Sequence, residues 1–254
     1  MKLTVVGCSG SYPGPDSAAS SYLLEHEHEG RMWRLLIDLG NGALGQLHRY
    51  VDPVHIDAVA LSHLHADHCL DLCGFYVLRK YHPTGAQPRI PVWGPPDTAR
   101  RMAKAYDLDE DPGMNEEFDF RTYPVEPVHV GPFTIEAIPV AHPVPAYGLR
   151  VSAGGAVLAY SGDTGICDGL LEVARDADVF LCEASFIHGD PNPPDLHLTG
   201  VEAGEVATRA DARTLVVTHI PPWHDADVIM AEARGAYPGT LHQATAGLTI
   251  DLTR

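Results

Sequence analysis

Short apolar runs rich in β-branched and aromatic residues alternate along the chain with stretches whose apolar positions recur every three or four residues. The first pattern is typical of strands and the second of amphipathic helices. In the first half we predict strands at 2–6, 21–24, 33–38 and 58–61, and helices at 69–80 and 97–106. In the second half we predict strands at 133–140, 148–151, 156–161, 179–182, 214–218, near 240 and at 246–252, and helices at 168–175, 199–209 and 226–234.

Two β-rich halves, each ending in strand and helix units, predict an α/β fold in which two sheets pack face to face with helices outside. A length of 254 residues fits one domain or two small ones. Because the sequence contains no linker composition and no low-complexity tract, we expect a single domain over residues 1–254.

Composition limits the compartment in which this chain would work. No apolar run approaches the ~20 residues of a membrane span, and the N-terminal run from Leu3 to Gly7 is too short for a secretion signal. The five cysteines are an odd number without a C-x-x-C pair, which is typical of a reducing environment. We therefore expect a cytoplasmic protein with no membrane partner.

The charge balance argues against polyanionic partners. Seventeen basic and 34 acidic side chains give a net charge of −17, which repels RNA, DNA and anionic membranes. The local exception is the segment 79–104, where six basic side chains accompany one acid, Asp97. Acidic residues follow at once over 107–119 and would cancel its field beyond ~10 Å. We interpret the segment as a solvated surface and RNA as a poor candidate partner.

Residues 61–68, LSHLHADH, concentrate metal-ligand side chains between an apolar strand and a predicted helix. At such a turn His63 and His65 can point to one ion while Asp67 and His68 point to a neighbour. Zinc usually takes four ligands and keeps an open position in catalytic sites, so one ion would not use all four side chains. The segment therefore predicts two ions, with further ligands elsewhere in the chain.

Three further candidate ligands, His142, Asp163 and His219, lie just past apolar strands, where a rigid scaffold would present them. Glycines on both sides of Asp163 allow close backbone approach and leave both carboxylate oxygens free to bridge two ions. A single histidine is more often a hydrogen-bonded core or surface residue, but the combination favours a dinuclear site. His26 and His28 also alternate, yet glutamates flank them and no helix follows, so we interpret them as an exposed hairpin edge.

These motifs resemble the metallo-β-lactamase superfamily: residues 63–68 match its H-x-H-x-D-H signature, and the three later ligands match in order. The resemblance covers nearly the whole chain and implies an αββα four-layer sandwich of two mixed β-sheets flanked by helices. It also implies two Zn²⁺ ions, for which Mn²⁺ or Fe²⁺ could substitute. The implied ligands are His63, His65 and His142 for the first ion, Asp67, His68 and His219 for the second, and Asp163 with a hydroxide between them.

Within the superfamily the chain is similar to the ribonuclease Z-like branch, through GCSGS at 7–11, LCEAS at 181–185 and LHLT at 196–199. Transfer-RNA-processing members of that branch carry a long arm between the third histidine and the bridging aspartate. The corresponding interval here holds only about two strands and a turn, which leaves no room for such an arm. We therefore do not expect full ribonuclease Z activity from this chain.

The closer resemblance is to the compact, atypical class II cyclic-nucleotide phosphodiesterases, through GPDS at 14–17, SGDTGICD at 161–168 and THIPPW at 218–223. It implies an enzyme that hydrolyses 3′,5′-cyclic nucleotides, cAMP above all, to 5′-monophosphates by attack of a metal-bridging hydroxide. Asp67 is then a catalytic residue as well as a ligand. His197 is the candidate proton donor to the leaving oxygen, or otherwise a loop histidine that caps a helix.

Two other functions and several finer expectations stay open. A ribonuclease Z-like tRNA 3′-end endonuclease lacking the arm is the alternative enzyme, and a non-catalytic metal-binding module is the third hypothesis. The aromatic residues that could stack on a base are Tyr147, Phe186, Trp223 and His224, although each fits the core or an interface equally well. Because resembling proteins usually pair, we expect a homodimer, with Tyr76 and Tyr81 on the helix at 69–80 at its contact.

Overall fold

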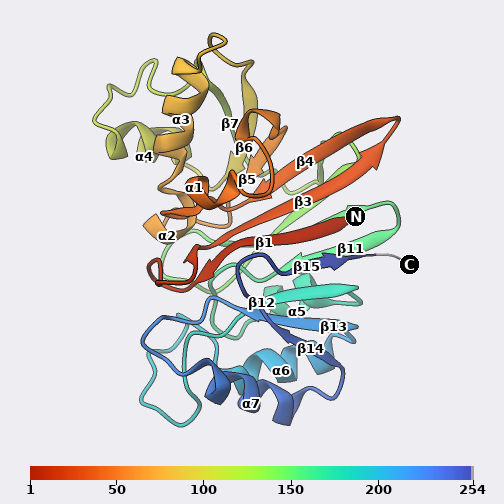
Figure 1. Ribbon diagram of the computed structural model, residues 1–254. Coiled ribbons are helices and arrows are strands. Elements are labelled where there is room, and N and C mark those ends of the chain that lie inside the picture. The colour runs from red at the N-terminus through yellow and green to blue at the C-terminus, as the bar shows by residue number, and fades with distance from the viewer. Residues whose placement is uncertain (253–254) are drawn as a thin grey trace.

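The computed structural model describes residues 1–252 and shows four layers, with two β-sheets stacked in the centre and helices on both outer faces (Figure 1). Both sheets combine parallel and antiparallel pairs. Helices from the first half of the chain cover one sheet and helices from the second half cover the other (Figure 1). The expected αββα sandwich of two mixed sheets is therefore confirmed.

The first sheet holds the N-terminal strands and the last one. Its order is β15 (Thr249–Asp251), β1 (Lys2–Ser9), β3 (Ser21–His28), β4 (Arg31–Ile37), β5 (Ala58–Ala60), β6 (Ile90–Gly94) and β7 (Phe118–Thr122), with β2 (Ala18–Ala19) paired to β1. The strands from β15 to β4 pair antiparallel, and those from β4 to β7 pair parallel. Strand β15 pairs with β1, so the two ends of the described chain meet in this sheet.

The second sheet has the same mixed character. Its order is β14 (Thr240–Gln243), β13 (Thr214–Thr218), β12 (Val179–Glu183), β11 (Ala156–Tyr160), β10 (Tyr147–Ala153), β9 (Phe133–Pro139) and β8 (Val128–Val130). The strands from β14 to β11 are parallel, and those from β11 to β8 form antiparallel hairpins. The parallel half ends several consecutive strands at one edge, which is where polar side chains can converge.

Seven α-helices complete the layers within residues 1–252. They are α1 (Ala43–Leu47), α2 (Ala66–Cys69), α3 (Leu72–Tyr81), α4 (Thr98–Ala105), α5 (Asp168–Ala174), α6 (Gly200–Arg209) and α7 (Ala226–Ala236), together with one 3₁₀ turn at Pro53–His55. A capping box defines the start of α6, because Thr199 accepts from the Glu202 amide and Glu202 accepts from the Thr199 amide. In this part of the chain, none of the helices has the length and apolar character needed to cross a membrane.

Three apolar clusters fill the spaces between the layers. One lies between the sheets and includes Leu3, Tyr22 and Leu149, and the others lie under the helices and include Phe75 and Phe180. All five of these side chains are fully buried. Burying one large apolar side chain stabilises a fold by about 1.5–3 kcal/mol, so the strand ends project from a rigid scaffold.

The single helix predicted at 69–80 is divided in the structure. The structure has two helices there, α2 and α3, separated at Leu70 and Asp71. The Asp71 amide donates to the Leu39 carbonyl instead of continuing the turn, and its carboxylate accepts from the Leu44 amide, so packing against the 39–44 segment interrupts the helix. As a result Asp67 and His68 lie on a short helix of their own.

Strands β6, β7 and β8 were not predicted from the sequence. Strand β6 contains Pro91, which has no amide hydrogen to donate to a neighbouring strand, and β7 begins at Phe118, within the acidic stretch over 107–119. Strands β6 and β7 form because β5 offers an open edge that β6 joins and β7 then extends, whereas β8 pairs with β9 at the edge of the second sheet. Tertiary pairing outweighs local sequence pattern here.

Candidate metal centre

The seven predicted ligands converge at one end of the sandwich, where they fall into two groups that share Asp163. The rigid strand ends and the short helix α2 position them. His63 and His65 follow β5, Asp67 and His68 lie on α2, His142 follows β9, Asp163 follows β11 and His219 follows β13.

His63, His65 and His142 form the first cluster. His63 Nε2 lies 3.1 Å from His65 Nδ1, and His142 Nε2 lies 3.2 Å from the same atom. Tetrahedral ligands bound to zinc at 2.0–2.1 Å are about 3.3 Å from one another. The three nitrogen atoms therefore have the spacing of ligands around one ion.

Asp67, His68 and His219 form the second cluster. His219 Nε2 lies 3.2 Å from both Asp67 Oδ2 and His68 Nε2, and Asp67 Oδ2 is 3.5 Å from His68 Nε2. Two nitrogen atoms and one carboxylate oxygen at these distances also match a tetrahedral donor set.

Asp163 lies between the clusters, with one oxygen toward each. Its Oδ2 is 3.7 Å from His63 Nε2, whereas its Oδ1 is 3.2 Å from His68 Nε2 and 3.4 Å from His219 Nε2. The residue is buried, and within residues 1–252 its Oδ1 accepts no well-directed hydrogen bond. A buried carboxylate oxygen without a hydrogen bond is costly, and a divalent cation would satisfy it. The donor set thus fits two metal ions that share this carboxylate.

The outward-facing nitrogen atoms of three ligands are held by hydrogen bonds. His142 Nδ1 donates to the Leu196 carbonyl at 3.1 Å, and His68 Nδ1 donates to Asp38 Oδ2 at 2.7 Å. Both acceptors lack a proton to give, so the proton of the neutral imidazole stays on Nδ1, and in that neutral form Nε2 carries the lone pair that faces the cluster. His219 Nδ1 lies 2.8 Å from the Ser185 hydroxyl. Such outer contacts orient histidine ligands and fix their tautomers.

Asp38 is the centre of the network behind the second cluster. Besides His68 it accepts from the Ser62 amide at 2.7 Å, from the Ser62 hydroxyl at 2.8 Å and from the Tyr160 hydroxyl at 2.9 Å. The carboxylate is fully buried, and its backbone has a left-handed φ of 54°. A fully hydrogen-bonded buried carboxylate of this kind positions the ligand beside it.

Electrostatics favour the forms of these residues that bind metal. Burial, reinforced by the charge of His68, holds the pKa of His63 well below its usual value, and burial lowers the pKa of His65 and His142. Although burial opposes a charge on Asp163, the neighbouring histidines hold the pKa of its carboxyl well below its usual range. The first cluster therefore offers neutral imidazoles, and the shared aspartate is ionised.

His68 differs from the other ligands in its charge. Burial opposes its protonation, yet Asp163 and Asp38 on either side raise the pKa of His68 well above its ordinary value. The space between those two carboxylates therefore attracts positive charge. A divalent cation at the second cluster would replace that proton.

His197 lies beside both clusters and pairs with a buried glutamate. Its Nδ1 donates to Glu183, with Oε1 at 2.9 Å and Oε2 at 3.2 Å. Burial opposes a charge on His197, but the carboxylate of Glu183 outweighs burial and raises the pKa of His197 to about 9. Glu183 is in turn held by the Thr164 amide at 2.7 Å and the Ser185 hydroxyl at 3.0 Å. The hydroxyl of Ser185 thus links the Glu183–His197 pair to His219.

Sequence reasoning did not assign roles to Asp38 and Glu183. Both stand at the ends of apolar strands, β4 and β12, which is the same signal that identified Asp163. That rule would have included them, since polar residues at strand ends meet at one edge of a sheet.

The candidate base-stacking residues are dispersed. The ring of Tyr147 packs on Tyr123 against the core between the sheets, with ring centres 5.3 Å apart, so it is a core residue. Phe186 meets His197 edge-on at 5.2 Å and stays at the site. Trp223 is exposed, and its ring lies 5.5 Å from that of Tyr12 and 5.9 Å from that of His224.

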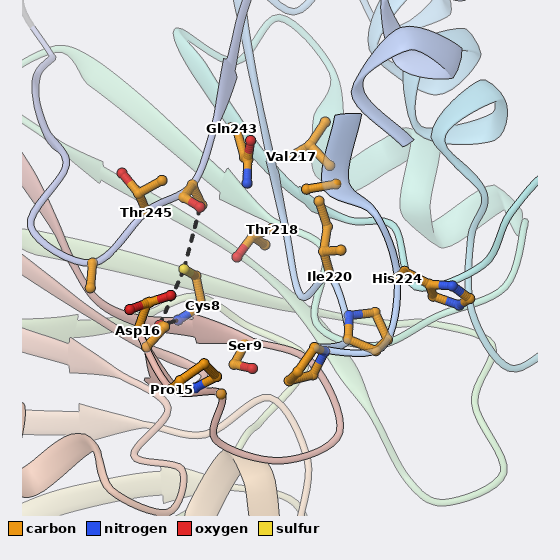
Figure 2. Close-up of a pocket in the computed structure, with 17 residues that line it drawn as sticks. Cys8, Ser9, Pro15, Asp16, Val217, Thr218, Ile220, His224, Gln243 and Thr245 are labelled. Atoms are coloured by element: carbon orange, nitrogen blue, oxygen red, sulfur yellow. Dashed lines mark hydrogen bonds between the residues drawn. The ribbon is translucent and has the colours of Figure 1, made fainter. Parts of the chain in front are cut away.

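A pocket of about 270 Å³ is lined by the neighbours of His219 in the chain, Thr218 and Ile220, and by Cys8 (Figure 2). The His219 amide donates to the Cys8 carbonyl at 3.0 Å, and the Cys8 thiol donates to the Ala244 carbonyl. Figure 2 shows Cys8 and Thr218 on facing segments, with Ile220 beyond them. His219 itself has a left-handed φ of 59°, a strained conformation that these contacts maintain.

The other histidine pair and the predicted dimer contact can also be located. His26 and His28 lie on the β3–β4 hairpin, where His28 is exposed as predicted and His26 is half-buried. Tyr76 is buried against Tyr106, contrary to the expected exposed position, whereas Tyr81 is exposed. The homodimer stays a prediction.

One known family matches most of this chain, and a bacterial relative matches all of it. The family described as "Beta-lactamase superfamily domain" matches residues 33–220. An uncharacterized protein of Mycobacterium tuberculosis is 47% identical over 261 aligned residues, which cover 100% of this chain and 93% of that protein.

Two further relatives are informative about the fold and the chemistry. The probable metallo-hydrolase YhfI of Bacillus subtilis is 29% identical over 97% of this chain and 98% of its own. Its crystal structure, described as a metallo-β-lactamase fold protein, has a TM-score of 0.85 and covers 98% of this chain and 99% of that one at 28% identity. A ribonuclease Z of Myxococcus xanthus is 28% identical over 99% of this chain and 98% of its own.

Proposed function

This chain belongs to the β-lactamase superfamily, and from that premise we propose that it is a dinuclear zinc phosphodiesterase that hydrolyses 3′,5′-cyclic nucleotides, with cAMP favoured. The superfamily match and the buried clusters of histidine and aspartate support the coarser statement that the chain is a metallo-hydrolase. The substrate and the identity of the metal are the proposal.

In this proposal His63, His65 and His142 hold one zinc ion, while Asp67, His68 and His219 hold the other. Asp163 would be a ligand of both ions, and an ion would then be the partner that its buried Oδ1 atom needs. When bound, zinc lowers the pKa of water to about 7 and stabilises negative charge on a phosphoryl group. The role of Asp67 beyond metal binding stays a prediction.

The observation that carries the proposal is the His197–Glu183 pair beside the two clusters. The His197 ring centre is 5.7 Å from that of His142 and 5.5 Å from that of His219. Because Nδ1 is engaged by Glu183, Nε2 is the atom free to hold a proton for the substrate. In phosphodiester hydrolysis that proton would go to the oxygen that leaves phosphorus, which is typically worth ~10² to 10⁴ in rate.

Two features support a small phosphodiester as the substrate. The Myxococcus relative is named a ribonuclease, an enzyme that cleaves RNA, and the RNA backbone consists of phosphodiesters. A scaffold of this family can therefore support phosphodiester hydrolysis. Between His142 and Asp163 the chain forms only β10 and β11 with short connections, a compact hairpin rather than an arm that could grip a long polymer. The net charge of −17 also disfavours polynucleotides, whereas a small anion meets mainly the local charge of the metals.

A tRNA 3′-end endonuclease is the second candidate, and the resemblance to ribonuclease Z over the whole chain favours it. The two functions separate in one experiment with zinc-loaded protein. We expect 3′,5′-cAMP to be turned over to 5′-AMP with a higher kcat/KM than a short RNA with a 3′ extension. Parallel reactions with cyclic GMP and with 2′,3′-cyclic nucleotides define the leaving oxygen through the product, a 5′- or a 3′-monophosphate.

Efficient RNA cleavage without cAMP turnover would establish the second candidate instead. If protein shown by metal analysis to hold two ions left all of these phosphodiesters intact, the proposed function would be wrong.

A further inference from the structure

A pocket of about 480 Å³ opens beside the first cluster, and we name it the α4 pocket after the helix that forms one wall. His65 belongs both to the first cluster and to the lining of this pocket, so the pocket is continuous with the candidate metal centre. Pro95 and Pro145 are among its apolar walls. Its charged lining consists of three bases of α4 and one acid, Arg100, Arg101, Lys104 and Asp97. The volume is within the range of pockets that bind small ligands.

The cations of the α4 pocket differ from the other basic residues in the segment 79–104. Arg79 is buried and donates to the Pro88 carbonyl, while Lys80 pairs with Glu116 and Glu117 at 3.4 Å. Arg89 pairs with Asp119 at 3.3 Å. The surface interpretation of the segment is therefore wrong for Arg79, which is buried, whereas acids that follow in the sequence neutralise Lys80 and Arg89.

Two of the three bases on α4 have no such partner. Arg100 pairs with Asp97 at 3.0 Å, but no carboxylate in residues 1–252 lies within ion-pair distance of the side chains of Arg101 or Lys104. Arg101 is half-buried, and the two residues are three apart on the helix, which places their charges on one face. Like charges at that spacing destabilise a helix by a few tenths of a kcal/mol, so this face is suited to an anion that neutralises it.

We propose that the α4 pocket binds a second phosphate of the substrate, so that a phosphodiester carrying a further phosphate beyond the one that is hydrolysed reacts faster than the same phosphodiester without it, while cAMP stays the favoured cyclic mononucleotide. This inference rests on the proposed function, since it takes the scissile phosphate to lie at the two clusters. The prolines then face the sugar ring, which links the two phosphates, or the base attached to it, and Arg101 and Lys104 bind the distant phosphate.

A cyclic mononucleotide does not use this pocket fully. Its single negative charge is on the phosphate at the metal centre, and its base is neutral, so Arg101 and Lys104 gain no ionic partner from it. A nucleotide that bears another phosphate, such as a short linear or cyclic dinucleotide, satisfies both ends. Within the phosphodiester class, we therefore expect a higher kcat/KM for nucleotides that bear a second phosphate.

The test compares two activated esters that differ in one phosphate: the p-nitrophenyl ester of thymidine 5′-phosphate, with and without a 3′-phosphate. With zinc-loaded protein we expect kcat/KM to be about ten- to a hundredfold higher for the ester that bears the 3′-phosphate, the range for hydrogen bonds to charged groups. In the double variant Arg101→Gln/Lys104→Gln the ratio of the two values should fall to about one. Arg89→Gln, which removes a basic residue outside the pocket, is the matched control and should keep the ratio.

Equal kcat/KM for the two esters in the natural protein would overturn the inference, as would a preference that survives in the double variant. A separate phosphate ion held in the pocket would also leave the two esters equal. If protein that holds two metal ions turns over neither ester, the proposed function fails. Whether the α4 pocket binds a second phosphate is then tested by measuring nucleotide affinity alone. Calorimetry should then show thymidine 3′,5′-bisphosphate binding at least tenfold more tightly than thymidine 5′-monophosphate, a difference lost in the double variant, and equal affinities would contradict the pocket's role.

Discussion

The two ligand clusters share Asp163 but differ in how the protein surrounds them. In the second cluster His68 and His219 are 0% and 1% exposed, and side chains, Asp38 and Ser185, hold their outer nitrogen atoms. In the first cluster His65 and His142 are only half-buried, and the outer support of His142 is a loop carbonyl.

This difference separates two tasks within one site. A buried cluster with a charged outer partner binds a metal tightly, because the partner raises ligand basicity and fixes orientation. A half-buried cluster beside a pocket remains accessible to substrate. We infer that the second cluster anchors its ion, whereas the first cluster is the side from which substrate enters.

The largest expected effect comes from removing what the clusters share. Asp163→Asn takes the negative charge from both, so bound zinc should fall from two ions per chain to fewer than one. Turnover should fall by more than about 10⁴-fold, because each ion is worth several kcal/mol of charge stabilisation. Metal analysis and cAMP turnover measure the two effects, with Asp227→Asn on the exposed start of α7 as the control. Two retained ions in the Asn variant would show that the clusters do not depend on a common carboxylate.

His197 tests whether the site has a proton donor distinct from both clusters. His197→Ala should keep two zinc ions and lose between about 10² and 10⁴ in kcat, the usual contribution of general acid catalysis. His188→Ala, an exposed histidine of the neighbouring loop, is the matched control. Near-normal turnover in the His197 variant would remove this residue from the mechanism.

The sequence predicted the ligands better than their surroundings. His63, His65, Asp67 and His68 are close in the chain, and the later ligands follow apolar strands, so local pattern was sufficient to select them. The short helix α2 was not predictable, because a contact between Asp71 and the 39–44 segment ends it.

Contacts between residues far apart in the chain could not be predicted from local sequence pattern. The partner of His68 is Asp38, which follows β4, the strand next to β5. The strand-end rule marks Asp38 as a candidate polar residue, but local pattern does not specify that β4 and β5 are neighbours or that these two side chains meet. The half-burial of the first cluster likewise depends on how α4 and the 143–145 segment border it, which only the folded chain determines.

Asp38→Asn tests the anchoring role of the second cluster. The substitution keeps the shape of the side chain but removes the charge that faces His68, so zinc affinity at this cluster should fall about 10- to 100-fold. Competition with a chelator of known affinity measures both ions, and the weaker-binding ion of the natural protein should be unaffected. Asp109→Asn in the exposed acidic loop is the control. An equal loss at both clusters would show that they are not supported independently.

The smallest expected effect concerns the loop that supports the first cluster. Leu196, whose carbonyl holds His142, is three residues before Thr199, the N-cap of α6. Thr199→Ala removes the capping hydroxyl and should lower the free energy of unfolding by about 1 kcal/mol. Because the cap anchors this loop and not the elements behind His68, the accompanying loss of zinc affinity, under about tenfold, should be confined to the first cluster. Thr199→Ser keeps the hydroxyl and should restore both properties. An affinity loss at the second cluster instead would mean that the loop supports the buried ion, and the division between an anchored and an accessible cluster would have to be abandoned.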